Sequence, residues 1–174
     1  MKISSLSELE QLQRAIQNNM IAAHEKMKMQ ISESSPMDFL VGLRFLKTGV
    51  DPIKGTELNF VEQLNQLFSD IVIIEATRHL LSGFPHHTFE LRLGTTPGFD
   101  IESEDGAIVA ECFAATTALS NRKLEHDSKK IQDRAKEKEK FLFFYSQNDT
   151  EINLQQIYKK YPDIHFVRIR SLSL

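Results

Sequence analysis

The spacing of apolar residues along the chain predicts helices in some segments and strands in others. Over residues 6–31, apolar side chains recur every three or four positions, which is the period of one buried helix face. Further helices are expected over four segments: 37–47, 56–81, 122–138 and 154–161. Short β-like runs predict strands over five segments: 88–93, 98–103, 107–114, 141–145 and 164–169. Helices therefore come first, and strands dominate the second half.

The order of these elements predicts the fold class. After the N-terminal helices the expected order is α-β-β-β-α-β-α-β, which is typical of an α/β fold with a layered sheet. The run Phe141–Tyr145 is apolar at almost every position, as expected for a strand that helices cover on both faces. We expect a central mixed sheet flanked by helices over residues 51–174 and an N-terminal helical extension over residues 1–50.

Composition excludes several classes of protein. Of the 174 residues, 41% are hydrophobic and 26% are charged, which allows a real core and excludes a mainly disordered chain. The longest apolar runs, such as Ile71–Ile74, are too short to span a membrane. No secretory hydrophobic region is visible near Met1, and the single Cys112 cannot form an internal disulfide. These features predict a cytoplasmic protein with no membrane partner.

Charge is unevenly distributed, although the formal net charge is only −3. Residues 57–111 carry ten acidic and two basic side chains, whereas residues 112–174 carry twelve basic and eight acidic ones. A basic segment folded beside an acidic pocket could bind phosphate groups next to a bound cation. The alternative is an ordinary solvated helix face with charges of both signs.

Two acids flank a tight turn in the most informative stretch of the sequence, residues 98–113. Asp100 lies in one expected strand, the turn Glu104-Asp105-Gly106 follows, and Glu111 lies in the next strand. Antiparallel neighbours joined by such a turn place these residues side by side. Like charges among apolar side chains raise each other's pKa, and a divalent cation such as Mg²⁺ would stabilise both carboxylates.

The helix, the hairpin with Asp and then Glu, the next helix and the returning strand resemble the PD-(D/E)xK nuclease superfamily, also called restriction-endonuclease-like. The resemblance covers about residues 55–145 and implies an α-β-β-β-α-β core. It implies that Asp100 and Glu111 bind Mg²⁺, with Mn²⁺ as a substitute. The implied activity is hydrolysis of phosphodiester bonds in nucleic acid, DNA rather than RNA, in restriction, repair or defence.

The sequence departs from the family pattern at one important position. The family has a Lys two residues after the second acid, and this chain has Phe113 there. Some members carry the Lys on the following helix, so the resemblance points to Lys123 as the catalytic lysine. Lys123, Asp127 and Lys130 share one helix face, and both lysines are candidates for nucleic-acid binding.

The family often adds an acid from the first core helix, and the resemblance points to Glu62 as a catalytic residue, with Glu57 as the second candidate. Each candidate also has a purely structural explanation. Glu111 could be a buried acid paired with Arg92 or Lys123, and Lys123 could simply pair with Asp127 at i,i+4.

Two other functions stay open. Because Phe113 replaces the lysine, the chain could be a catalytically inactive nuclease-fold protein that binds nucleic acid or a protein partner. It could also be an adaptor that forms a homodimer through a helical seam, and the seam residues would be Leu9, Leu12, Ile16, Met20, Ala23 and Met27.

Overall fold

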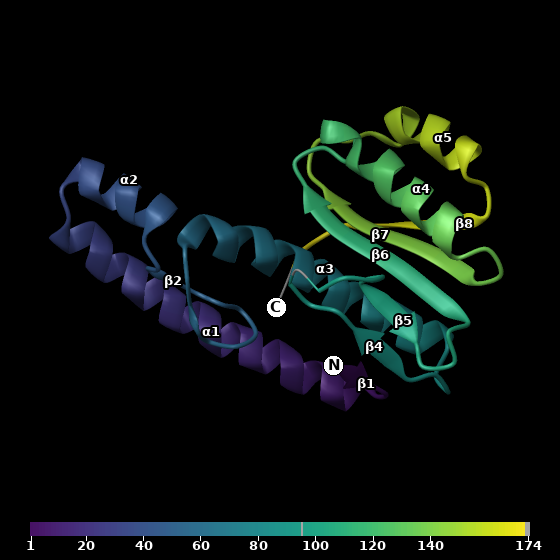
Figure 1. Cartoon of the computed structure of the whole chain (residues 1–174), viewed down its shortest axis with the longest axis horizontal. Helices are drawn as coiled ribbons and strands as arrows, with labels where there is room; N and C mark the ends of the chain where they lie inside the picture. The colour runs from purple at the N-terminus through teal and green to yellow at the C-terminus, as the bar shows by residue number, and fades with distance from the viewer. Residues whose placement is uncertain (95, 173–174) are drawn as a thin grey trace. The chain divides into compact units, whose positions relative to one another are not determined.

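The computed structural model of the chain describes residues 1–94 and 96–172, which form two compact units (Figure 1). The sheet unit combines Met1–Leu9 with the chain from Ser69 onward, and the helical unit is Glu10–Phe68. These two units differ from the predicted division at residue 50. The first residues add a strand to the sheet, and the segment after residue 50 forms a hairpin that belongs to the helical unit.

A mixed six-stranded sheet forms the centre of the sheet unit, with the order β1-β4-β5-β6-β7-β8. Its strands are β1 (Lys2–Ile3), β4 (Phe89–Leu91), β5 (Ile101–Ser103), β6 (Ile108–Ala115), β7 (Glu139–Ser146) and β8 (Ile164–Ile169). The pairs from β1 to β6 are antiparallel, whereas β6, β7 and β8 are parallel. The expected α/β fold with a mixed sheet is thus confirmed.

Helices cover both faces of this sheet. The crossover helices α4 (Lys123–Arg134) and α5 (Glu151–Lys160) lie on one face, and residues 69–83 of α3 (Phe60–Gly83) lie on the other (Figure 1). The core under α4 and α5 joins Leu124 and Ile131 to Phe113 and Phe144, all of which are buried. On the opposite face, the ring of His79 meets Phe143 edge to face at 5.4 Å.

The helical unit contains residues 10–33 of α1 (Leu6–Glu33), α2 (Pro36–Phe45) and a small hairpin of β2 (Gly49–Val50) and β3 (Glu57–Leu58). The side chain of Gln63 in α3 accepts a hydrogen bond from the backbone of Val50 at 2.8 Å. Asn19 in α1 donates to the carbonyl oxygen of Pro52, also at 2.8 Å. These side-chain bonds attach the hairpin to both helices.

The start of α4 differs from its prediction. Asn121 and Arg122 both adopt positive φ angles, 52° and 55°, and neither side chain caps the helix. A short 3₁₀ turn (η1, Ser120–Arg122) precedes α4, and backbone bonds such as Leu124 N to Ala118 O satisfy its donors. The chain turns sharply between β6 and α4, and the positive φ angles of Asn121 and Arg122 form part of that turn.

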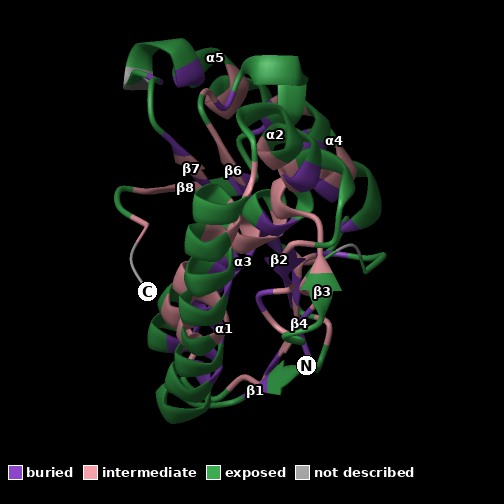
Figure 2. Cartoon of the chain, turned by 90° about the vertical axis from the view of Figure 1, so that its left-hand side faces the viewer, coloured by how far each residue is buried: buried purple, intermediate pink, exposed green. Residues whose placement is uncertain are grey.

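Burial counts against the predicted dimer seam on α1, although Met20 and Met27 are only half-buried. Leu9 and Ile16 are 0% exposed, and Leu12 and Ala23 are also buried, so these side chains are not available to a second molecule. Figure 2 shows α1 exposed along its other side. No helix in the described part of the chain combines the length and apolar character needed to cross a membrane.

Candidate acidic site on the sheet

The register of two antiparallel strands brings Asp100 and Glu111 together. Ile101 pairs with Ala110 and Glu102 with Val109, so the next position along the ladder sets Asp100 opposite Glu111. Cross-strand neighbours point to the same face of a sheet. That face is the one that α4 covers, because Val109 belongs to the core under α4. The side-by-side placement expected from the sequence is present.

Asp100 is held at the end of β5 by the backbone of β6. The amide of Cys112 donates to Asp100 Oδ2 at 2.7 Å, and the backbone of Arg92 donates to the carbonyl oxygen of Asp100 at 2.8 Å. Burial raises the pKa of the Asp100 carboxyl, although the Cys112 hydrogen bond opposes that shift. A carboxylate in this position gains stability from any additional cation.

Glu111 is a buried acid with one basic neighbour. It is 3% exposed, and its Oε1 lies 2.6 Å from Nζ of Lys130 on α4. Burial, with a further contribution from the charge of Asp100, raises the pKa of Glu111 to about 7 in spite of this ion pair. The same ammonium donates to the carbonyl oxygen of Gly98 at 2.8 Å, so Lys130 connects α4, Glu111 and the segment before Asp100.

Lys123, the predicted catalytic lysine, pairs with Asp127 and not with Glu111. Its Nζ is 2.9 Å from Asp127 Oδ2 and 5.7 Å from the centroid of the Phe113 ring, and Lys130 takes the place beside Glu111. The geometry explains the difference, because α4 runs back along β6. Seven residues of helix span about 10 Å, and Phe113 lies about 7 Å beyond Glu111 on its strand. The two lysines therefore align with two different strand positions.

Phe113, at the position of the family lysine, is part of the hydrophobic core. It is 3% exposed and stacks on Phe144 with 5.7 Å between ring centroids. Cys112 beside it points to the opposite face and is also buried, and burial raises the pKa of its thiol well above the usual value. Neither side chain can therefore act as a base or a cation in this site.

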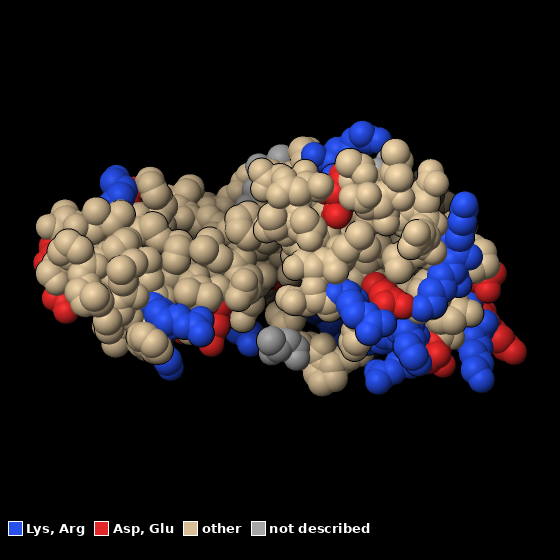
Figure 3. Space-filling view, turned by 90° about the horizontal axis from the view of Figure 1, so that it is seen from above, with Lys and Arg blue, Asp and Glu red and all other residues tan. Residues whose placement is uncertain are grey.

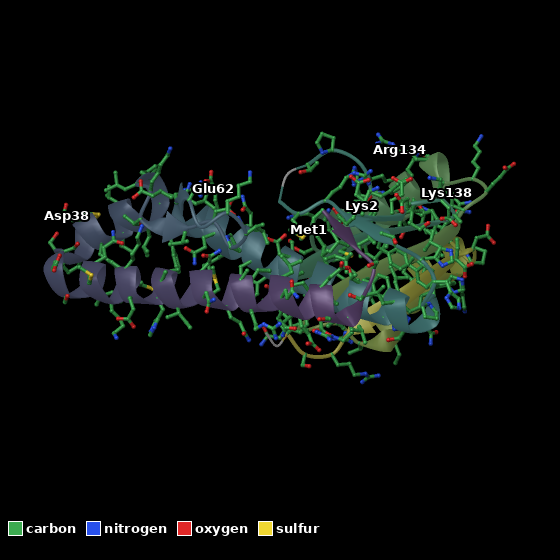
Figure 4. All side chains as sticks on the ribbon, turned by 90° about the horizontal axis from the view of Figure 1, so that it is seen from below. Met1, Lys2, Asp38, Glu62, Arg134 and Lys138 are labelled. Carbon is green, nitrogen blue, oxygen red and sulfur yellow. The ribbon has the colours of Figure 1, made fainter. Side chains whose placement is uncertain are left out.

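A second network of charges lies on the same face of the sheet, at Glu102, two residues along β5 from Asp100. Glu102 accepts from Lys138 at 2.6 Å and from Arg92 at 3.1 Å, and these cations lower the pKa of its carboxyl (Lys138 is labelled in Figure 4). Arg92 also donates to the carbonyl oxygen of Phe99 at 3.0 Å. Gly98 takes a φ of +124° where the Arg92 side chain packs against it. The segment before Asp100 is thus held by Arg92, which binds the carbonyl oxygen of Phe99, and by Lys130, which binds that of Gly98.

The acids predicted on the first core helix belong to the helical unit. Glu62 is exposed in the first turn of α3, where its backbone donates to Asn59 (Glu62 is labelled in Figure 4). Glu57 is exposed and forms an ion pair with Lys26 at 3.7 Å. Of the two acids that α3 contributes to the sheet unit, Asp70 and Glu75, Asp70 is 1% exposed and accepts from the Gly94 amide at 3.4 Å. Catalytic roles for Glu62 and Glu57 stay predictions.

Asp127 is a buried acid near Asp100 and Glu111, which the sequence had indicated only as an ion-pair partner of Lys123. It is 2% exposed, and its negative charge contributes to the raised pKa values of Asp100 and Glu111. With Lys123 and Lys130 the site holds three acids and two lysines. The i,i+4 spacing of Lys123 and Asp127 indicated their ion pair. The sequence could not show that the carboxylate of Asp127 would be buried.

The donor set of this site fits Mg²⁺. Oδ1 of Asp100 and Oε2 of Glu111 form no hydrogen bond with the residues that the structure describes, so each carboxylate keeps one oxygen available. Mg²⁺ commonly binds one or two carboxylates and completes its coordination with water and substrate phosphates. Among the described residues no group of three or more His, Cys, Asp or Glu side chains is arranged to hold a metal. Water and substrate would therefore supply most of the coordination.

Basic side chains surround a hollow of about 690 Å³ at the beginning of α4 and the end of α5. Its basic lining comes from Arg122, Lys123, Lys129 and Lys160, together with His126, and the acids Glu125 and Asp133 also line it. Figure 3 shows Lys and Arg, interspersed with Asp and Glu, on one side of the sheet unit. Glu125 binds both Arg122 and Lys160, and these two cations lower its pKa to about 2. Lys123 thus borders both this hollow and the acidic site.

Compared with protein-family models, curated protein sequences and solved structures, the chain gives no significant match.

Proposed function

We propose that this chain is a metal-dependent nuclease-like protein with a restriction-endonuclease-like core, which hydrolyses phosphodiester bonds of nucleic acid, DNA in the first place. The observation that carries the proposal is the adjacency of Asp100 and Glu111 on one face of the sheet, with the ammonium of Lys130 at 2.6 Å from Glu111. The order α3-β4-β5-β6-α4-β7 agrees with the α-β-β-β-α-β core of that superfamily.

Each side chain has a defined task in this proposal. Asp100 and Glu111 would hold Mg²⁺, which when bound withdraws charge from a phosphate oxygen and lowers the pKa of a bound water. Lys130 favours the ionised form of Glu111 and can donate to a non-bridging phosphate oxygen, whose charge increases in the transition state. Cys112 orients Asp100 through its amide. Basic residues at the start of α4, together with Lys130, would bind the flanking phosphates.

We expect Asp100→Asn and Glu111→Gln each to reduce Mg²⁺-dependent cleavage by at least about 100-fold, because each removes a charged oxygen ligand while keeping its shape. Glu102→Gln is the matched control, since Glu102 lies on the same sheet face but is already bound by Lys138 and Arg92. The measurement is the cleavage rate of labelled DNA and RNA with Mg²⁺ or Mn²⁺. Full activity in the first two variants would disprove the proposal.

The pKa of Glu111 predicts how a divalent cation binds as pH changes. Binding requires the ionised carboxylate, and the pKa of Glu111 is raised from 4.5 to about 7. We therefore expect Mn²⁺ affinity to fall about tenfold per pH unit below pH 7 and to become constant above about pH 8. Calorimetric titration with Mn²⁺ at several pH values below and above 7 measures this affinity. An affinity independent of pH would contradict the role of Glu111.

One observation favours the alternative of a nuclease fold that binds nucleic acid or a protein without cutting. Phe113 occupies the position of the family lysine, and Lys130 already neutralises Glu111 without a metal. Binding of DNA that is unaffected by Asp100→Asn, with no cleavage under Mg²⁺ or Mn²⁺, would favour this alternative. The basic hollow would then be the main functional surface.

A further inference from the structure

Helix α2 of the helical unit exposes an unusual number of large apolar side chains. Met37 is 68% exposed, Leu40 58% and Phe45 74%, and Val41 is 41% exposed. Gly42 is the buried residue of this ten-residue helix. A helix that is apolar on every side is normally buried, because its exposed face costs free energy in water.

The helix is nevertheless held in a defined orientation. Ser35 caps its N-terminus by accepting a hydrogen bond from the amide of Asp38, and Pro36 occupies its first position. At Gly42 the helix meets Gln30 of α1 so closely that an added Cβ would lie 1.9 Å from the Gln30 side chain. The Gly42 side is therefore packed against α1, which fixes the direction of the exposed side chains.

The exposed face has a symmetric pattern centred on Val41. Met37 and Phe45 lie four residues before and after it, and the opposite charges Asp38 and Arg44 lie three residues before and after it. At 100° per residue all of these positions fall within about 60° of the direction of Val41. Asp38 and Arg44 are both exposed (Asp38 is labelled in Figure 4).

From this pattern we infer that α2 is the interface of a homodimer, in which two copies of α2 pack antiparallel with Val41 near the two-fold axis. This arrangement puts Asp38 of one copy at the level of Arg44 of the second, and Met37 at the level of Phe45. A parallel pair would set Asp38 beside Asp38 and Arg44 beside Arg44, which is repulsive. The apolar positions then become buried in a self-complementary contact.

This inference does not depend on the proposed function, and the molar mass of the full chain tests it. We expect a dimer in sedimentation equilibrium between about 1 and 100 µM. Phe45→Ser should weaken the dimer at least about tenfold, because it removes a central apolar contact. Ile152→Ser is the matched control, since Ile152 on α5 is 78% exposed but lies outside α2. That variant should keep the mass of the dimer.

Charge exchange tests whether Asp38 and Arg44 lie in the interface. Arg44→Asp makes the face acidic and Asp38→Arg makes it basic, so each variant alone should weaken the dimer at least about tenfold. A mixture of the two should form a heterodimer, because every Asp then meets an Arg in the antiparallel arrangement. Circular dichroism confirms that both variants are folded. A monomeric wild type, a dimer unaffected by Phe45→Ser, or a mixture that does not associate would each overturn the inference.

Discussion

Lys130→Met should reduce Mg²⁺-dependent cleavage by about 10²–10³-fold, whereas Lys123→Met should reduce it by less than about tenfold. Lys130 lies 2.6 Å from Glu111, so its removal takes away both the counter-charge of a buried acid and a donor for phosphate. Lys123 is 2.9 Å from Asp127 and its side chain is 48% exposed. Its loss should mainly weaken substrate binding.

These two variants form a matched pair, because both replace a lysine of the same helix face with an unbranched apolar side chain. Single-turnover rates at saturating substrate separate the chemical step from binding. Lys130→Met should lower the rate constant itself, and Lys123→Met should lower the apparent affinity and the salt dependence of binding. Equal rates in both variants, or a larger loss of rate in Lys123→Met, would contradict the assignment of Lys130.

Phe113→Lys, which restores the family motif in the sequence, should unfold the protein instead of activating it. Phe113 is 3% exposed and stacks on Phe144. Loss of a buried aromatic side chain costs about 3–5 kcal/mol, and a buried unpaired ammonium adds several kcal/mol more. This sum is comparable to the stability of about 5–15 kcal/mol that is typical of a domain.

Urea denaturation followed by circular dichroism measures the effect of Phe113→Lys. Ile152→Lys is the control, because it introduces the same charge at a position that is 78% exposed, and its effect should stay within about 0.5 kcal/mol. Phe113→Leu, which keeps an apolar side chain, should be intermediate. A folded Phe113→Lys variant with increased cleavage would show that this position belongs to the active site and not to the core.

The long elements of the fold could be predicted because their own sequences determine them. The strand over residues 164–169 is confirmed as β8, and the run 141–145 lies inside the covered strand β7. The two-residue strands β1, β2 and β3 carry too little local pattern to be predicted, because pairing with distant residues defines them. The division into two units depends on these pairings, so the local pattern of the sequence does not show it.

The candidate site was predictable in part. A hairpin turn fixes the register of its strands, and so the sequence could place Asp100 beside Glu111. Helical periodicity placed Lys123, Asp127 and Lys130 on one face of α4, but it says nothing about how far a helix is shifted along the strand beneath it. The position of α4 along β6, which follows the turn at Asn121 and Arg122, brings Lys130 to Glu111.

The most direct test of the central claim is a crystal structure of the chain soaked in Mn²⁺, measured at a wavelength where manganese scatters anomalously. We expect one anomalous peak between the carboxylates of Asp100 and Glu111, within coordination distance of an oxygen from each, and no such peak in Asp100→Asn. Two carboxylates that stay free of Mn²⁺, with Lys130 still bound to Glu111 at saturating metal, would contradict the proposal that this pair is a metal site.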